Sequence, residues 1–75
     1  MEYISGYVDH IIFQNSDNGY TVLELVSGET TTTCVGMLFG VTDGMNVELE
    51  GEFTEHPSYG RQFKAARFVE KEPED

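Results

Sequence analysis

Residues 45–53 alternate strictly between two kinds of side chain, and this limits how the chain can fold more than any other feature. Apolar residues and one glycine hold the odd positions from Met45 to Phe53, whereas the even positions hold Asn46 and three glutamates. Successive side chains of a β-strand point to opposite faces. The segment therefore predicts a strand with one buried face and one acidic, solvated face. Because no part of the chain shows a helical stripe, the sequence predicts an all-β protein.

Four more strands are expected beside the one at residues 45–53. They are predicted at residues 3–13, 20–26, 31–38 and 61–69. The first contains Gly6, which indicates a bend or bulge, and its consecutive apolar residues 11–13 predict a curved strand that is buried on both faces. In the second, Thr21, Leu23 and Leu25 form the expected core face. Asn-Gly, Ser-Gly and Asp-Gly pairs supply the turns.

This arrangement favours a small five-stranded OB-type Greek-key barrel. A barrel removes the free edges that a flat sheet of five strands would expose. Residues 39–44 leave room for about one helical turn. The helix that many OB folds carry between strands three and four is therefore expected to be reduced or absent. A small SH3-like barrel is the alternative fold.

The length of 75 residues allows one domain, assigned to residues 1–70, with the charged residues 71–75 as a linker or tail. Such a domain has an expected stability of about 3–5 kcal/mol. Its single cysteine, Cys34, cannot form an internal disulfide, which fits a reducing cytoplasm. Its first ten residues lack the basic and apolar regions of a signal peptide, and no apolar run approaches membrane-spanning length, so neither a signal peptide nor a membrane span is expected. We therefore expect a cytoplasmic protein whose isolated domain is a monomer.

Charge is distributed very unevenly along the chain. The net charge is −10, and no Lys or Arg precedes Arg61. The four basic residues are Arg61, Lys64, Arg67 and Lys71. An acidic protein does not bind nucleic acid non-specifically, so any anionic partner is expected at the strand of residues 61–69.

The candidate site on this strand is a nucleic-acid or docking contact made by Tyr59, Arg61, Lys64 and Arg67. Cations can meet phosphates, and exposed aromatic rings can stack on bases. The aromatic candidates are Tyr7, Tyr20, Tyr59 and Phe68. Strict alternation would place Arg61 and Arg67 on one face and Lys64 on the other. In the alternative interpretation, these cations pair with Glu48, Glu50 and Glu52 on the neighbouring strand.

The turn at residues 56–60 has its own signals. Pro57 favours an extended His56, and Gly60 suits a turn that needs a positive φ. The structural interpretation is that this turn sets the register of the last two strands. For Tyr59 and Arg61, a structural role and an exposed contact with DNA or another domain are equally well supported.

Chemistry at a metal or a nucleophile is not expected. His10, Cys34 and His56 lack the paired spacing of metal ligands, and Cys34 has no base near it in sequence. The three glutamates of residues 48–52 are interpreted as a solvated face. The sequence thus predicts no catalytic residue, no metal site and no cofactor in this chain.

Four phrases of the sequence are similar to a known family. The chain resembles the N-terminal OB-like domain of long-form RecD-type DNA helicases, the RecD/TraA group. The matching phrases are Ser5–Tyr7 with Ile12-Phe13, NGYTVL at 18–23, VELEGEF at 47–53 and HPSYGRQFK at 56–64. The chain departs from the family in having Phe53 where tryptophan is frequent and a threonine-rich loop at 27–33.

The resemblance implies a parent protein that is an ATP-dependent 5′-to-3′ DNA helicase of repair and recombination, similar to the exodeoxyribonuclease V alpha subunit. ATP and Mg²⁺ are implied for that parent. They are not implied for this chain, because it lacks the phosphate-binding G-x-x-x-x-G-K-[ST] motif and its first lysine is Lys64. We expect a non-catalytic accessory domain that docks on the remainder of the helicase chain or on another protein, with weak contact to single-stranded DNA as a further role. The alternative is a free-standing protein-interaction module unrelated to DNA.

Overall fold

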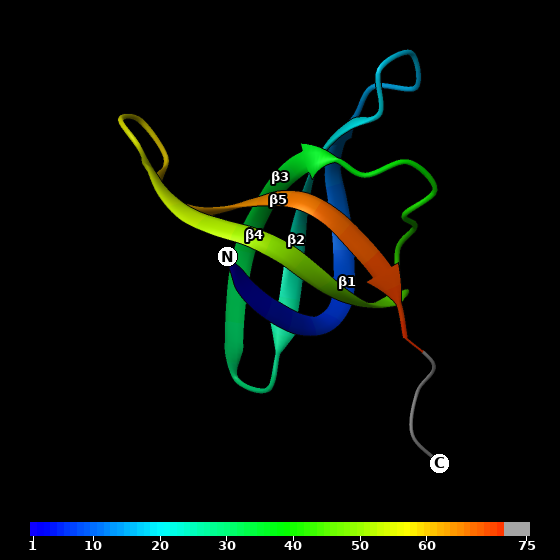
Figure 1. Ribbon diagram of the computed structural model, residues 1–75, viewed down its shortest axis with the longest axis horizontal. Coiled ribbons are helices and arrows are strands. Elements are labelled where there is room, and N and C mark those ends of the chain that lie inside the picture. Colours follow the sequence, from blue (N-terminus) through cyan, green and yellow to red (C-terminus); the bar gives the residue numbers. More distant parts are fainter. Residues whose placement is uncertain (72–75) are drawn as a thin grey trace.

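The computed structural model describes residues 1–71 and consists of five β-strands joined by turns and loops (Figure 1). The strands are β1 (Glu2–Gln14), β2 (Tyr20–Ser27), β3 (Thr30–Met37), β4 (Asn46–His56) and β5 (Gly60–Glu70). Each lies within a few residues of a strand expected from the sequence. No helix among the described residues is long and apolar enough to cross a membrane.

The strands close into one barrel in the order β1-β2-β3-β5-β4. β1 closes it by pairing with both β2 and β4, and β3 pairs with β5 in the only parallel contact among the described strands. Residues 38–45, between β3 and β4, form turns and no helix. The expected all-β five-stranded barrel with its helix absent is therefore confirmed.

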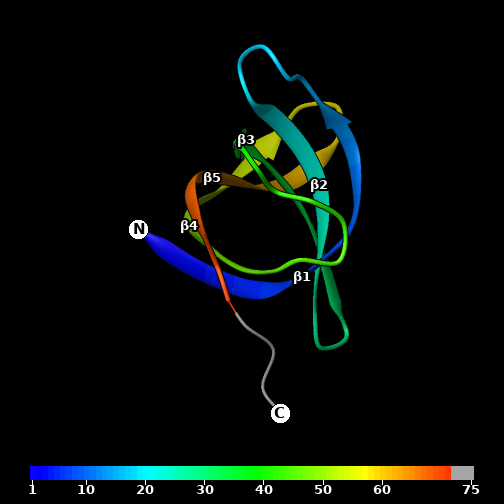
Figure 2. The same ribbon diagram turned by 90° about the vertical axis from the view of Figure 1, so that its right-hand side faces the viewer.

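The loops gather at the two ends of this barrel. Figures 1 and 2 place the β1–β2 loop and the tip of the β4–β5 hairpin at one end, and the β2–β3 turn at the other. The backbone N–H of Lys71 donates to the carbonyl of Asn46 at 2.7 Å, which continues the β4–β5 pairing by one residue. The rest of the tail expected at 71–75 lies outside the described residues.

The core fills the barrel with side chains from every strand and from the β3–β4 connection. Thr21, Leu23 and Leu25 of β2 are buried as expected, and the Thr21 hydroxyl donates to the Gly19 carbonyl at 3.0 Å. The other buried hydrophobic residues are Val8, Cys34, Leu38, Val41, Val47, Leu49, Phe63 and Ala65. The alternation of β4 is confirmed, since Val47, Leu49 and Gly51 are all buried.

Two bulges in β1 change which of its side chains face the core. The register with β2 shifts between Val8 and His10 and again between Ile11 and Phe13. Each extra residue reverses the alternation beyond it, so that Ile11 packs against the core, whereas Ile12 is 53% exposed and Phe13 is 51% exposed. The expectation that residues 11–13 are buried on both faces is therefore wrong, although β1 does curve through two pairings.

A third bulge lies in β5. Glu50 pairs with Arg67 and Gly51 pairs with Ala65, which leaves Ala66 without a partner. Beyond this residue the alternation is reversed, so Phe68 packs against the core and Arg67 faces outward. Lys64 therefore shares the outer face with Arg67, while Arg61 lies on the face of Phe63. The expectation that Arg61 and Arg67 share a face is wrong.

The barrel depends on very close approach of backbones at three glycines, Gly6, Gly36 and Gly51. A Cβ atom at Gly6 would overlap the carbonyl oxygen of Val26, and a Cβ atom at Gly51 would overlap the carbonyl oxygen of Lys64. Neither contact involves a side chain that could turn away. Gly51 also lies opposite the β5 bulge, so a larger residue there would push β4 and β5 apart.

The Cys34 thiol lies in the barrel core and is 0% exposed. Burial, with a smaller contribution from the Glu24 carboxylate, raises the pKa of the thiol to about 12 from its ordinary value of 9.0. The thiolate is the reactive form of cysteine. Cys34 is therefore protected both by lack of access and by its protonation state.

We expect Gly51→Ala to destabilise the protein by about 2–3 kcal/mol, because the barrel backbone must move to admit the methyl group. Gly28→Ala is the matched control, since its Cβ atom would meet nothing within 4 Å although its φ is +62°. The control should cost about 1 kcal/mol. Urea unfolding measures both, and equal losses for the two variants would contradict the close approach at Gly51.

We expect the Cys34 thiol of the folded protein to react with a disulfide reagent at neutral pH on the order of 10²–10³ times more slowly than the thiol of the urea-unfolded chain, because reaction requires opening of the barrel. Because the pKa of the Cys34 thiol is higher in the folded protein, the protonated thiol stabilises the folded state. This stabilisation is lost as the pH rises from 9.0 toward about 12. Stopped-flow absorbance measures the reaction. Equal rates for the folded and unfolded chains would show that Cys34 is accessible.

Candidate binding groove

The outer face of β1, β2 and β3 carries an open groove, bounded at one side by the tip of the β4–β5 hairpin. Its volume is about 520 Å³. It is lined by Ile12, Phe13, Tyr20, Val22, Thr33, Val35, His56, Tyr59 and Gln62. Most of these side chains are apolar or aromatic, which makes the groove a candidate for binding rather than for catalysis.

The floor of the groove is one row of side chains across β1, β2 and β3, and the row continues beyond the groove to Lys64 of β5. Phe13 pairs with Val22, Val22 with Val35, and Val35 with Lys64 of β5. Partners in register point to the same face of a sheet, so an apolar row ends in a single cation. Lys64 forms no ion pair with any residue in 1–71.

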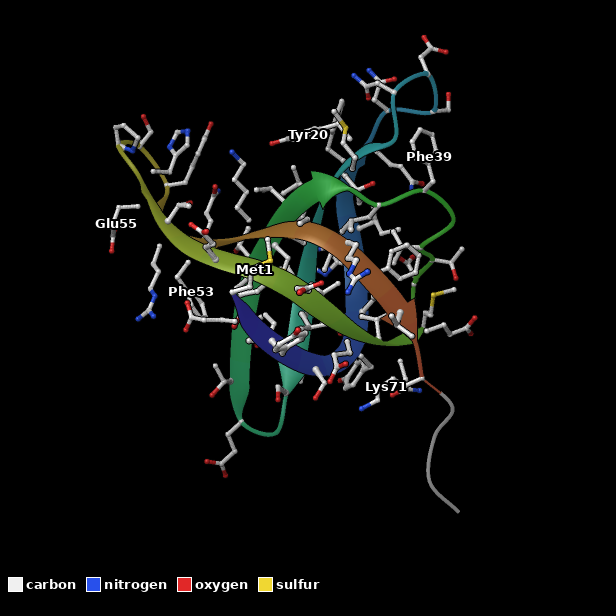
Figure 3. The ribbon with its side chains drawn as sticks, in the orientation of Figure 1. Met1, Tyr20, Phe39, Phe53, Glu55 and Lys71 are labelled. Carbon is white, nitrogen blue, oxygen red and sulfur yellow. The ribbon has the colours of Figure 1, made fainter. Side chains whose placement is uncertain are left out.

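Two aromatic rings, Phe13 and Tyr20, stand at one end of this floor. The ring centroids of Phe13 and Tyr20 lie 6.4 Å apart, and Tyr20 pairs in register with Met37, which is 56% exposed. In Figure 3, Tyr20 and Phe39 lie near the β1–β2 loop, whereas Phe53 and Glu55 lie along the β4–β5 hairpin. The exposed apolar surface thus extends beyond the groove toward Met37.

The hairpin tip at residues 56–60 is held by its own hydrogen bonds. The backbone N–H groups of Ser58 and Tyr59 donate to Nδ1 of His56, at 3.0 and 3.2 Å. The His56 and Tyr59 rings lie 4.7 Å apart, and Gly60 has the expected positive φ, at 79°. His56 pairs with Gly60, so this turn does set the register of β4 and β5, and it presents Tyr59 to the groove.

Two of the basic residues are paired with glutamates of β4. Arg67 Nε donates to the Glu50 carboxylate, which also accepts a hydrogen bond from the Tyr3 hydroxyl at 3.0 Å. These two donors lower the pKa of Glu50, Arg67 having the larger effect. Lys71 Nζ lies 3.7 Å from the Glu48 carboxylate. The interpretation in which cations neutralise the acidic face of β4 is confirmed for these two pairs.

Arg61 is engaged in a different way. Its guanidinium carbon lies 4.1 Å from the centroid of the Phe53 ring, which is a cation–π geometry. Arg61 is the register partner of Glu55 and shares the face of Phe53 and Phe63. It therefore lies on the opposite face of the hairpin from Lys64.

The four site residues expected from the sequence are thus not brought together. Tyr59 lines the groove, Lys64 lies beyond its floor as the register partner of Val35, Arg61 covers Phe53, and Arg67 faces Glu50. Of the other expected aromatic contacts, Tyr20 lines the groove and Phe68 packs on the core. Within residues 1–71, no group of three or more His, Cys, Asp or Glu residues could hold a metal ion.

Sequence reasoning missed Ile12, Phe13, Val22 and Val35 as groove residues. Ile12 and Phe13 were missed because an uninterrupted apolar run at residues 11–13 predicts core positions, and the bulges of β1 give no signal in the sequence. A signal for Val22 was present, since Tyr20, Val22 and Val26 place three apolar residues on the face of β2 that points away from the core. An apolar outer face is a sign of a binding surface.

Comparison with known proteins identifies one family. A family model described as the OB-fold domain of the ATP-dependent DNA helicase YrrC matches residues 1–73, nearly the whole chain. No curated protein and no solved structure matches the chain.

Proposed function

Because this chain belongs to the family of OB-fold domains of the ATP-dependent DNA helicase YrrC, we propose that it is a non-catalytic accessory domain of such a helicase. Its outer groove docks on another domain of the helicase chain or on a protein partner. The parent binds ATP and Mg²⁺ elsewhere in its sequence. The resemblance to RecD-type helicases supports 5′-to-3′ movement and a role in DNA repair and recombination in the cytoplasm.

The exposed apolar groove is the observation that carries the docking proposal. Ile12, Phe13 and Tyr59 are each more than half exposed and line one continuous surface. Large exposed apolar patches mark interaction sites, and aromatic residues are enriched in protein interfaces. The net charge of −10 and the engagement of Arg61, Arg67 and Lys71 by their neighbours favour a protein partner over an anionic polymer.

Contact with single-stranded DNA is a second candidate function for the same groove. The Phe13 and Tyr20 rings and the Tyr59 ring can stack on bases, and Lys64 continues the row of the floor beyond Val35. OB folds bind oligonucleotides on the face of strands two and three and on the loops beside it. One cation gives weak binding, since affinity for nucleic acid grows with the number of phosphates neutralised.

A free-standing interaction module remains the alternative to a helicase domain, and the reading frame separates the two. A helicase parent must encode a G-x-x-x-x-G-K-[ST] motif in the same open reading frame. Absence of that motif from the complete reading frame would contradict the helicase proposal and leave the groove as a docking surface of an independent module.

We expect the double substitution Ile12→Ser and Tyr59→Ser to weaken docking about tenfold or more, because exposed apolar anchors carry much of the energy of an interface. The measurement is binding of the 75-residue chain, added in trans, to the remainder of the helicase by calorimetry. Unwinding by the full helicase with the same substitutions should fall as well.

The matched control is Val69→Ser with Tyr3→Ser. Val69 is 58% exposed and Tyr3 is 61% exposed, and neither lines the groove. The control should bind like the unsubstituted chain. If both double variants bind equally well, or if Arg61→Ala with Arg67→Ala is the only change that weakens docking, the groove is not the docking surface.

For the second candidate, we expect oligo-dT to shift the amide resonances of Phe13, Tyr20, Tyr59 and Lys64 at low salt. Because one cation lies beside the groove, the logarithm of the binding constant should fall with the logarithm of salt concentration with a slope of about −0.7. Lys64→Ala should abolish this slope, and Arg67→Ala should leave it unchanged. Unmoved resonances at about millimolar DNA, well above the usual range of non-specific binding, would exclude a single-strand role for this domain alone.

A further inference from the structure

The barrel is closed, but β3 and β5 pair over only a short length. β3 pairs with β5 at Cys34, Val35 and Gly36 only. The first half of β3, Thr30–Thr33, pairs with β2 along one edge. Along its other edge, no strand among residues 1–71 pairs with these four residues. Alternate N–H and C=O groups of a strand point to each edge, so this edge offers backbone donors and acceptors.

Nothing in the sequence of this edge protects it from pairing. Edge strands that avoid association usually carry lysine, proline or a bulge. Residues 30–33 are four threonines, and their pairing with β2 runs without a register shift. Threonine has high strand propensity. The edge is therefore straight, uncharged and able to accept another strand.

Hollows lie on both sides of this edge. On the inner side, a niche of about 370 Å³ is lined by Thr30 and Thr32 together with Ile4, Leu25 and Phe53 among others. On the outer side, Thr33 lines the groove already described. Side chains of an added strand would alternate between the two faces, so every second side chain would enter this niche, whose walls combine the apolar groups of Ile4, Leu25 and Phe53 with hydroxyl groups of Ser and Thr residues.

Acidic side chains dominate the outer side of the edge. Glu24 pairs in register with Thr33, and Glu29 immediately precedes Thr30. Arg61, the first cation of the β4–β5 hairpin, is held over the Phe53 ring on the opposite face of the sheet. The chain as a whole carries a charge of −10. A strand whose outward side chains are basic would complement this surface.

We propose that the Thr30–Thr33 edge of β3 binds an extended peptide segment of a partner protein as an added β-strand. The segment alternates apolar side chains, which enter the niche beside Phe53, with Lys or Arg side chains, which face Glu24 and Glu29. Backbone hydrogen bonds supply the affinity and the alternate side chains supply the specificity, as in other cases of strand addition. The proposed edge adjoins the groove at Thr33, and the test below separates binding at the edge from binding in the groove.

The test uses the 75-residue chain and a short synthetic peptide that alternates valine and lysine, blocked at both ends. We expect the peptide to shift the amide resonances of residues 30–33 and to slow their hydrogen exchange. A peptide with the same side chains but with alternate backbone nitrogens methylated should bind about tenfold more weakly or worse, because it cannot complete the ladder. A valine–glutamate peptide should bind least.

Two substitutions test the charge argument without altering the barrel interior. Glu24→Gln with Glu29→Gln should weaken the lysine peptide about fivefold, since each exposed ion pair contributes a two- to threefold effect. Asp17→Asn with Glu70→Gln is the matched control, because Asp17 lies in the β1–β2 loop at the opposite end of the barrel from the β2–β3 turn and neither residue lines the niche. It should leave the affinity unchanged.

Three results would overturn the proposal. Equal binding of the methylated peptide would exclude backbone pairing. Resonance shifts confined to Phe13 and Tyr20 would place the peptide in the groove instead. Sedimentation of the chain alone as a dimer, with residues 30–33 protected from exchange, would make a second copy of the chain the occupant. None of these results depends on whether the groove docks on the helicase.

Discussion

The double pairing of β1 is the constraint on which the rest of the barrel depends. Near Gly6 and Tyr7 this strand leaves β4 and joins β2, so one short stretch of backbone serves two ladders. Gly6 makes this possible because no side chain separates it from the carbonyl of Val26. Once β1 joins the two sheets, the core is enclosed and β5 has space only between β3 and β4.

Much of this fold could be predicted from the sequence, because strand alternation and turn residues are local signals. Thr21, Leu23 and Leu25 were assigned to the core correctly, and so was the acidic outer face of β4. Bulges are different, because an extra residue in one strand has meaning only against the partner strand. The faces of Phe13 and Arg67 were therefore wrong, and the groove that depends on Phe13 could not be predicted.

Charge pairing explains why a strand with several cations does not make an anion-binding site. The outer face of β4 presents glutamates in register with the cations of β5, and Glu50 binds Arg67 while it also accepts the Tyr3 hydroxyl. Such exposed pairs contribute little stability, but they neutralise the positive charges of Arg67 and Lys71. The surface left for recognition is the apolar groove with its aromatic rings.

The bulge at Ala66 has a consequence for how such domains can diverge. One residue without a ladder partner separates Ala65, which is buried, from Arg67, which is exposed. A deletion of Ala66 would remove the bulge and leave Arg67 opposite Glu50 and Phe68 opposite Leu49, and a substitution of Ala66 would also leave these pairs intact. Related domains can therefore differ at Ala66, or lack this residue, without exchanging the buried and the exposed side chains of β5.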